Sequence, residues 1–136
     1  MNIPPFKTLL YTVDGHISTI TMNRPEKRNA LSAQLVNELI VALETAADQD
    51  DVRVVILCGA GGAFCAGADL SLMSGGGEED PDIPFKGGFP ELNLAMRNSP
   101  LPIIAKVERY AMAGALALIC NSTFVIAEDD AKFCAP

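Results

Sequence analysis

The strongest constraint on the fold is a short, uninterrupted apolar run, VVIL at 54–57, bounded by charge and by Gly59. Such a run is typical of a strand that is covered on both faces. Upstream, Ser32 is a good N-cap, and apolar residues follow it at helical spacing as far as Ala46. A β-rich run at 17–22 precedes this helix. The order strand, helix, strand predicts a parallel crossover and therefore an α/β fold.

The N-terminal part of the chain predicts a β-hairpin. Two β-rich runs, 8–13 and 17–22, are separated by Asp14-Gly15-His16, and an Asp-Gly step is a strong hairpin signal. We expect His16 in this turn to be a solvated polar residue and not a catalytic base.

Beyond the central run, helices and strands continue to alternate. The pattern predicts a helix over 89–97, a buried strand over 103–107, a helix opened by the small residues of 111–117, and a strand over 124–127. No long-period repeat accompanies this order. We therefore interpret residues 1–136 as one α/β layer structure.

Charge and hydropathy exclude two classes of partner. The net charge is −7 and no basic stripe is present, whereas phosphate contacts to nucleic acid need clustered Lys and Arg. No apolar run approaches the ~20 residues that span a bilayer, and the start of the chain has neither a basic leader nor an apolar signal core. We expect no nucleic acid, no membrane and no export.

The four cysteines indicate a reducing, cytoplasmic setting. Cys58, Cys65, Cys120 and Cys134 form no CxxC pair and have apolar or small neighbours. Buried free thiols fit this pattern better than disulfides or a zinc site, so no metal is predicted.

Four segments in the same order resemble the amino-terminal portion of the enoyl-CoA hydratase/isomerase (crotonase) family. They are NRPEKRNALS at 23–32, GAFCAGADL at 62–70, PIIAKVERYAMAGALALIC at 102–120 and AEDDAKFCAP at 127–136. The resemblance covers essentially the whole chain, although members of the family are usually much longer. It implies a crotonase-like ββα-repeat (spiral) core, truncated before the C-terminal helices, and an incomplete acyl-CoA-binding domain over 1–136. A homotrimer or hexamer is implied if the C-terminal part is present.

The resemblance also implies an oxyanion hole, in which two backbone N–H groups polarise a thioester carbonyl so that an enolate can form. The first donor maps to Ala68, directly after Gly67, where a small residue lets the backbone approach the ligand. The second maps to Gly114, at the expected start of a helix, where N–H groups favour negative charge.

Contacts to coenzyme A map, by the same resemblance, to five positions. They are Arg28, Ala30, Ala66, Asp69 and Leu70. Arg28 is the most plausible phosphate partner because a guanidinium pairs phosphate oxygens in a fork, with Lys27 as its substitute. Asp69 can serve as a helix N-cap, as a ligand contact, or as both. Coenzyme A enters only as part of the thioester, so no separate cofactor is predicted.

The chain departs from the family pattern at the catalytic carboxylates. Hydratases carry a glutamate two positions after the glycine triplet, which is Ala113-Gly114-Ala115 here, and that position is Ala117. Alanine can neither give nor take a proton. The second hydratase glutamate would follow Pro136. Glu108-Arg109 stands where the family usually has Asn-Gly.

These residues predict an acyl-CoA-binding hydratase/isomerase-family enzyme, a lyase or isomerase, that is closer to an isomerase than to a two-glutamate hydratase. The alternative is a catalytically inactive or truncated crotonase scaffold that only binds acyl-CoA or partner subunits. Missing core elements favour this alternative, because they leave a sheet edge and apolar faces exposed.

Several local patterns have simpler interpretations. GAGGAF follows a buried strand, but Phe64 stands where a dinucleotide fingerprint needs a small residue. Glu108 could replace the missing acid or base, yet a solvent-facing residue paired with Arg109 is the favoured interpretation. Cys65 beside the expected donor is interpreted as a small buried hydrophobe. An acidic group near residue 80 matches no calcium loop and is interpreted as solvated. It comprises Glu78, Glu79, Asp80 and Asp82.

Overall fold

The computed structural model describes residues 3–73 and 80–135. The strands are β1 (Leu9–Asp14), β2 (Ile17–Met22), β3 (Val54–Gly59), β4 (Ile103–Val107), β5 (Tyr110–Met112), β6 (Phe124–Ala127) and β7 (Lys132–Cys134). The α-helices are α1 (Ala33–Asp48), α2 (Leu70–Met73), α3 (Phe89–Arg97) and α4 (Ala115–Cys120), and the 3-10 turns are η1 (Pro25–Lys27) and η2 (Ala60–Gly62).

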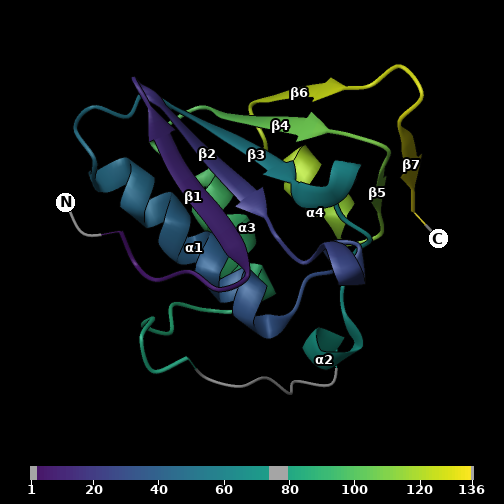
Figure 1. Cartoon of the computed structure of the whole chain (residues 1–136), viewed down its shortest axis with the longest axis horizontal. Helices are drawn as coiled ribbons and strands as arrows, with labels where there is room; N and C mark the ends of the chain where they lie inside the picture. Colours follow the sequence, from purple (N-terminus) through teal and green to yellow (C-terminus); the bar gives the residue numbers. More distant parts are fainter. Residues whose placement is uncertain (1–2, 74–79, 136) are drawn as a thin grey trace.

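Five strands form one mixed sheet in the order β1-β2-β3-β4-β6, and β5 and β7 form a small parallel pair beside it. Only β1 and β2 are antiparallel; the other neighbours in the large sheet are parallel. Figure 1 shows α1, α3 and α4 on one face of this sheet, with the β5–β7 pair beyond the ends of β4 and β6. This arrangement confirms the predicted α/β fold.

The hairpin and the crossover follow the sequence prediction. Asp14 pairs with Ile17, so Gly15 and His16 form a two-residue loop in which Gly15 has φ 60°, a conformation that glycine adopts without strain. In α1 the Ser32 Oγ accepts a hydrogen bond of 3.1 Å from the Leu35 N–H, as expected of an N-cap. The helix then returns the chain to a strand parallel to β2.

The helix predicted from Ala111 onward is wrong at its start. Tyr110–Met112 is strand β5, and α4 begins only at Ala115. The reason is pairing at long range: Ala111 forms a parallel bridge with Cys65, and the Met112 N–H donates to the Cys65 carbonyl at 3.1 Å. Ala113 then adopts φ 52°, a left-handed conformation that separates the strand from the helix.

A left-handed position at Arg109 gives a stability prediction. Arg109 is exposed and has φ 60°, which costs a side-chain-bearing residue about 1–2 kcal/mol. Arg109→Gly removes this strain but adds unfolded-state entropy, so we expect a net gain of about 0.5 kcal/mol in urea unfolding. Arg53→Gly, at an exposed position without positive φ, is the matched control and is expected to destabilise the protein. Equal losses in the two variants would refute the assigned strain.

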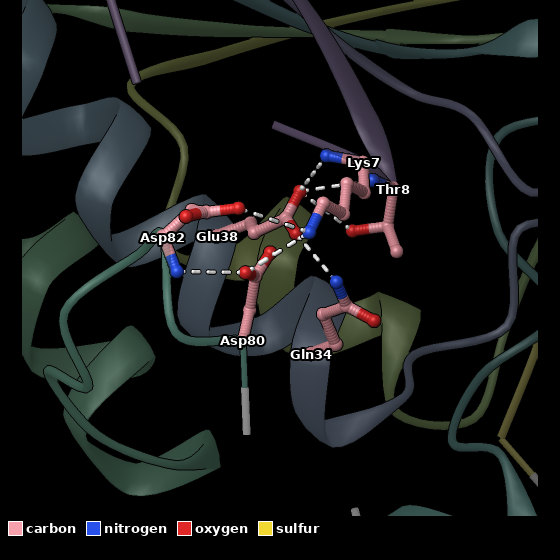
Figure 2. A network of polar contacts seen from close by, with 6 residues as sticks. All are labelled: Lys7, Thr8, Gln34, Glu38, Asp80 and Asp82. Atoms are coloured by element: carbon pink, nitrogen blue, oxygen red, sulfur yellow. Dashed lines mark hydrogen bonds and ion pairs between the residues drawn. The ribbon is translucent and has the colours of Figure 1, made fainter. Parts of the chain in front are cut away.

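A polar network joins the N-terminal segment, α1 and the segment that starts at Asp80. Figure 2 shows the buried Glu38 carboxylate facing the backbone of residues 7 and 8, and Lys7 facing two aspartates. The Lys7 Nζ lies 3.0 Å from Asp80 Oδ1 and 3.5 Å from Asp82 Oδ2. The Asp80 side chain is only 6% exposed, so the prediction that this aspartate is solvated is wrong. Glu78 and Glu79 lie outside the described residues.

No helix within 3–73 or 80–135 is long and apolar enough to cross a membrane. Over the same ranges, no group of three or more His, Cys, Asp and Glu side chains is arranged to hold a metal ion.

Candidate functional site

The candidate site is built on two segments that pair although they are far apart in sequence. Leu31 and Ala68 form an isolated parallel bridge. The Leu31 N–H donates to the Gly67 carbonyl at 2.8 Å, and the Asp69 N–H donates to the Leu31 carbonyl at 2.8 Å. One step earlier, the Ala66 N–H donates to the Arg28 carbonyl at 3.0 Å. The structure therefore brings the predicted coenzyme A segment beside the predicted first donor.

This pairing determines where the Ala68 N–H points. Successive peptide groups of an extended segment face opposite sides, and the Asp69 N–H faces Leu31. The Ala68 N–H therefore faces away from Leu31. It donates no hydrogen bond to any residue in the described part of the chain, and Ala68 itself is exposed. An exposed, unused N–H is available to a ligand.

Gly114 lies directly beside this donor. A methyl group placed on Gly114 would lie 3.7 Å from the Ala68 nitrogen, 3.8 Å from Phe89 Cζ and 4.0 Å from Leu31 Cδ1. Gly114 precedes α4, and its N–H likewise donates to no acceptor within residues 3–73 and 80–135. The two predicted donors thus lie close together, with the side chains of Phe89 and Leu31 beside Gly114. Neither Phe89 nor Leu31 was predicted from the sequence to lie at this site.

Gly67 allows the segment that carries Ala68 to contact the segment that carries Gly114. Its φ is 99°, and a methyl group there would lie 2.9 Å from the Met112 carbonyl oxygen, 3.0 Å from Ala113 Cβ and 3.5 Å from the Gly114 nitrogen. Any side chain at this position would be both strained and crowded. The close approach of the segments that carry Ala68 and Gly114 therefore requires glycine here.

Arg24, which was not predicted from the sequence to belong to the site, connects the segment before α1 with the segment that follows Ala68. Its Nη2 lies 3.0 Å from Asp69 Oδ2, and its Nη1 donates to the Ala30 carbonyl. Asp69 was predicted to be a helix N-cap or a ligand contact. The structure shows that its carboxylate makes an ion pair with Arg24, which neither interpretation included.

The predicted coenzyme A contacts differ in accessibility. Arg28 is exposed and has φ 54°. Ala30 and Ala66 are half-buried in the pairing itself, and Leu70, at the start of α2, is 80% exposed. The side chains of Arg28 and Leu70 can therefore touch a ligand without rearrangement, whereas the two alanines can contact it mainly through backbone groups.

The two positions considered for an acid or a base, Ala117 and Glu108, match the prediction only in part. Ala117 is a half-buried residue of α4 and offers no ionisable group. Glu108 was predicted to pair with Arg109; instead its carboxylate lies 3.9 Å from the Lys106 ammonium group, and its carbonyl accepts from the Phe64 N–H at 3.0 Å.

Of the four predicted buried thiols, only one is fully buried. Cys65 is buried and Cys58 half-buried, but Cys120 and Cys134 are exposed, and all four are free. Burial raises the pKa of the Cys65 thiol to about 11. At neutral pH it is protonated, which agrees with a structural and not a nucleophilic role.

Thiol labelling tests this assignment. With Ellman's reagent at pH 8, we expect Cys120 and Cys134 to react rapidly and Cys65 not to react until the protein unfolds. The Cys65 thiol is protonated at this pH and is buried away from the reagent. Cys65→Ala should therefore leave the rapid phase unchanged, whereas the control Cys120→Ala should reduce it. A smaller rapid phase in Cys65→Ala would contradict the burial of that thiol.

Comparison with known proteins defines the class to which this fold and site correspond. Residues 12–136 match the family model described as enoyl-CoA hydratase/isomerase. A probable enoyl-CoA hydratase, EchA14 of Mycobacterium tuberculosis, is 37% identical over 128 residues, covering 94% of this chain and 50% of that protein. EchA19 of the same organism, an enoyl-CoA hydratase, is 36% identical over 124 residues, covering 88% and 46%.

Solved structures agree. The crystal structure of an enoyl-CoA hydratase/isomerase from Marinobacter aquaeolei has a TM-score of 0.77 and 35% identity, covering 93% of this chain and 50% of that one. A probable enoyl-CoA hydratase from Mycobacterium smegmatis has a TM-score of 0.78 and 33% identity, covering 94% and 52%. The chain belongs to the enoyl-CoA hydratase/isomerase family, with a crotonase fold, and spans about half the length of the relatives it matches.

Proposed function

We propose that this chain binds an acyl-CoA thioester and polarises its carbonyl with the backbone N–H groups of Ala68 and Gly114. The observation that carries this proposal is the pair of adjacent N–H groups that have no acceptor in the described part of the chain. Two such donors stabilise the negative charge that develops on oxygen when a thioester becomes an enolate, and one donor contributes about 3 kcal/mol in other enzymes of acyl transfer.

Coenzyme A enters this proposal as part of the substrate. Arg28 is exposed beside the paired segments and is our candidate for a phosphate contact, while Leu70 offers apolar surface. Ala30, Ala66 and Asp69 shape the segment on which the ligand rests. A cytoplasmic location, an acyl-CoA-binding domain over 1–136 and a trimer or hexamer of the longer form belong to the same proposal.

Within the family, we favour an isomerase-like reaction over two-glutamate hydration. Hydration requires an acid and a base to add water across a double bond, and the position that would hold one of them is Ala117. Moving a double bond needs the enolate-stabilising donors and only one proton-transferring group.

A panel of enoyl-CoA and carboxyacyl-CoA thioesters tests the reaction type by mass spectrometry. Unchanged mass with a moved double bond supports isomerisation. A gain of water would contradict the preference for an isomerase, and loss of carbon dioxide would indicate a decarboxylase.

The second candidate function is a scaffold without turnover that binds acyl-CoA or partner subunits. It is favoured by edge strand β6, in which Phe124, Val125 and Ile126 are 62%, 42% and 62% exposed. An apolar edge of this kind calls for another chain to cover it. Size-exclusion chromatography separates the two: a defined trimer or hexamer supports the assembled enzyme, whereas aggregation together with unchanged thioesters supports the scaffold.

A further inference from the structure

One guanidinium group bridges the two segments that hold the first donor. Arg24 donates from Nη1 to the Ala30 carbonyl and from Nη2 to Asp69 Oδ2, the latter at 3.0 Å. The Arg24 and Asp69 side chains are 16% and 22% exposed, so the pair is largely shielded from water. Shielding strengthens such a contact relative to an ion pair at the surface.

The two contacts of Arg24 bracket the donor. Ala30 immediately precedes Leu31 and Asp69 immediately follows Ala68, and Leu31 and Ala68 are the bridged pair. Directly after Ala68, the Asp69 N–H donates to the Leu31 carbonyl and so joins the two segments. Arg24 therefore spans the bridged pair, with one contact just before Leu31 on the first segment and the other just after Ala68 on the second.

Arg24 is itself held in place. The backbone N–H of Arg24 donates to Asn29 Oδ1 at 2.8 Å, and the backbone N–H of Asn29 donates to the Arg24 carbonyl at 2.8 Å. The buried Asn29 side chain also donates to the carbonyls of Ala60 and Ala63, at 2.9 and 3.0 Å. A continuous series of contacts thus runs from the glycine-rich turn after β3, through Asn29 and Arg24, to Asp69.

We propose that Arg24 is a positioning residue that fixes the orientation of the Ala68 N–H through its simultaneous contacts with Ala30 and Asp69. This inference rests on the proposed use of Ala68 as a donor. The bridge depends on the planar fork of a guanidinium group, whose donors reach a carbonyl and a carboxylate at once. A lysine keeps the charge but is a single point donor, so it cannot replace the bridge.

The first test needs no ligand. In ¹⁵N relaxation measurements on the full chain, we expect Arg24→Gln, Arg24→Lys and Asp69→Asn to increase the mobility of the Ala68 and Asp69 amides. The control Arg53→Gln removes an exposed arginine that immediately precedes β3 and should leave both amides unchanged. Asp69→Asn preserves shape, so it decides the matter if the Arg24 variants fold poorly. Native mobility in Arg24→Lys and Asp69→Asn would overturn the proposal.

The second test distinguishes positioning from a purely structural role. The infrared stretching band of the ¹³C-labelled thioester carbonyl of crotonoyl-CoA should shift to lower frequency when the ligand binds the native chain. The Arg24→Lys variant should lose about half of that shift, because a slightly misplaced donor polarises the carbonyl less. The affinity of this variant for S-butyl-CoA, a thioether without the carbonyl, should stay within about threefold of the native affinity.

A full carbonyl shift in Arg24→Lys would refute the positioning role. A native chain that binds crotonoyl-CoA without any shift would refute the proposed function instead, while the amide mobility would still decide the role of Arg24.

Discussion

Replacing Gly67 with alanine is expected to slow any reaction that uses the Ala68 and Gly114 donors by about 100-fold, the scale associated with misplacing a positioned group by 1 Å. The new methyl group would lie 2.9 Å from the Met112 carbonyl oxygen and 3.0 Å from Ala113 Cβ, so the two donor segments must separate. The measurement is kcat with the enoyl-CoA that the native chain converts, together with the ¹³C carbonyl band of the bound thioester.

Gly62→Ala is the matched control for this change. Gly62 has φ 77°, so alanine is strained there as well, but its methyl group would meet nothing within 4 Å. We expect this variant to lose some stability and to keep its turnover and carbonyl shift. If Gly62→Ala lost as much activity as Gly67→Ala, backbone strain would explain the effect and the close approach of the donor segments would not.

Glu38→Ala is expected to lower the free energy of unfolding by about 2–4 kcal/mol, a large share of the stability of a small domain. The buried carboxylate receives the Lys7 N–H at 3.0 Å, the Thr8 N–H at 2.9 Å and the Thr8 hydroxyl at 3.0 Å, all on Oε1, while Gln34 donates to Oε2 at 3.1 Å (Figure 2). Alanine removes the shared acceptor of these donors, which lie in a partly buried place. Urea unfolding at 25 °C measures the loss.

The control is Glu44→Ala on the same helix. Glu44 is exposed and only approaches Lys86, at 3.7 Å, so its replacement should change the unfolding free energy by less than about 0.5 kcal/mol. Glu38→Gln, which keeps an acceptor oxygen, should fall between the two. Equal effects at 38 and 44 would show that the network around Glu38 does not anchor the N-terminal segment to α1.

Local pattern predicted most of the fold because the relevant signals are short-range. The Asp-Gly turn, the Ser32 N-cap and the apolar run at 54–57 each lie within the element that they define. Ala111 and Met112 of β5 were assigned to a helix because Ala111 opens a stretch with several small residues, which suits a helix, whereas the Cys65 that pairs with Ala111 lies far along the chain. Exposure of Cys120 and Cys134 was missed for a similar reason, since apolar neighbours in sequence do not fix burial in space.

The candidate site could be predicted only through resemblance. The mapping of Ala68 and Gly114 came from motif similarity, and their adjacency is visible only in three dimensions. The pairing of Arg24 with Asp69, 45 residues apart, has no local signal, because a charged residue in a loop is usually solvated. The same assumption misplaced Asp80, whose partner Lys7 lies 73 residues away.

The most direct test of the central claim follows the Ala68 and Gly114 amide protons by NMR while the chain is titrated with crotonoyl-CoA, with S-butyl-CoA as the ligand that lacks a thioester carbonyl. Our account predicts that both amide protons move downfield with crotonoyl-CoA and much less with S-butyl-CoA, because only the thioester carries an oxygen that can accept their hydrogen bonds. If neither amide moves, or if both respond equally to the two ligands, these groups do not form the oxyanion hole.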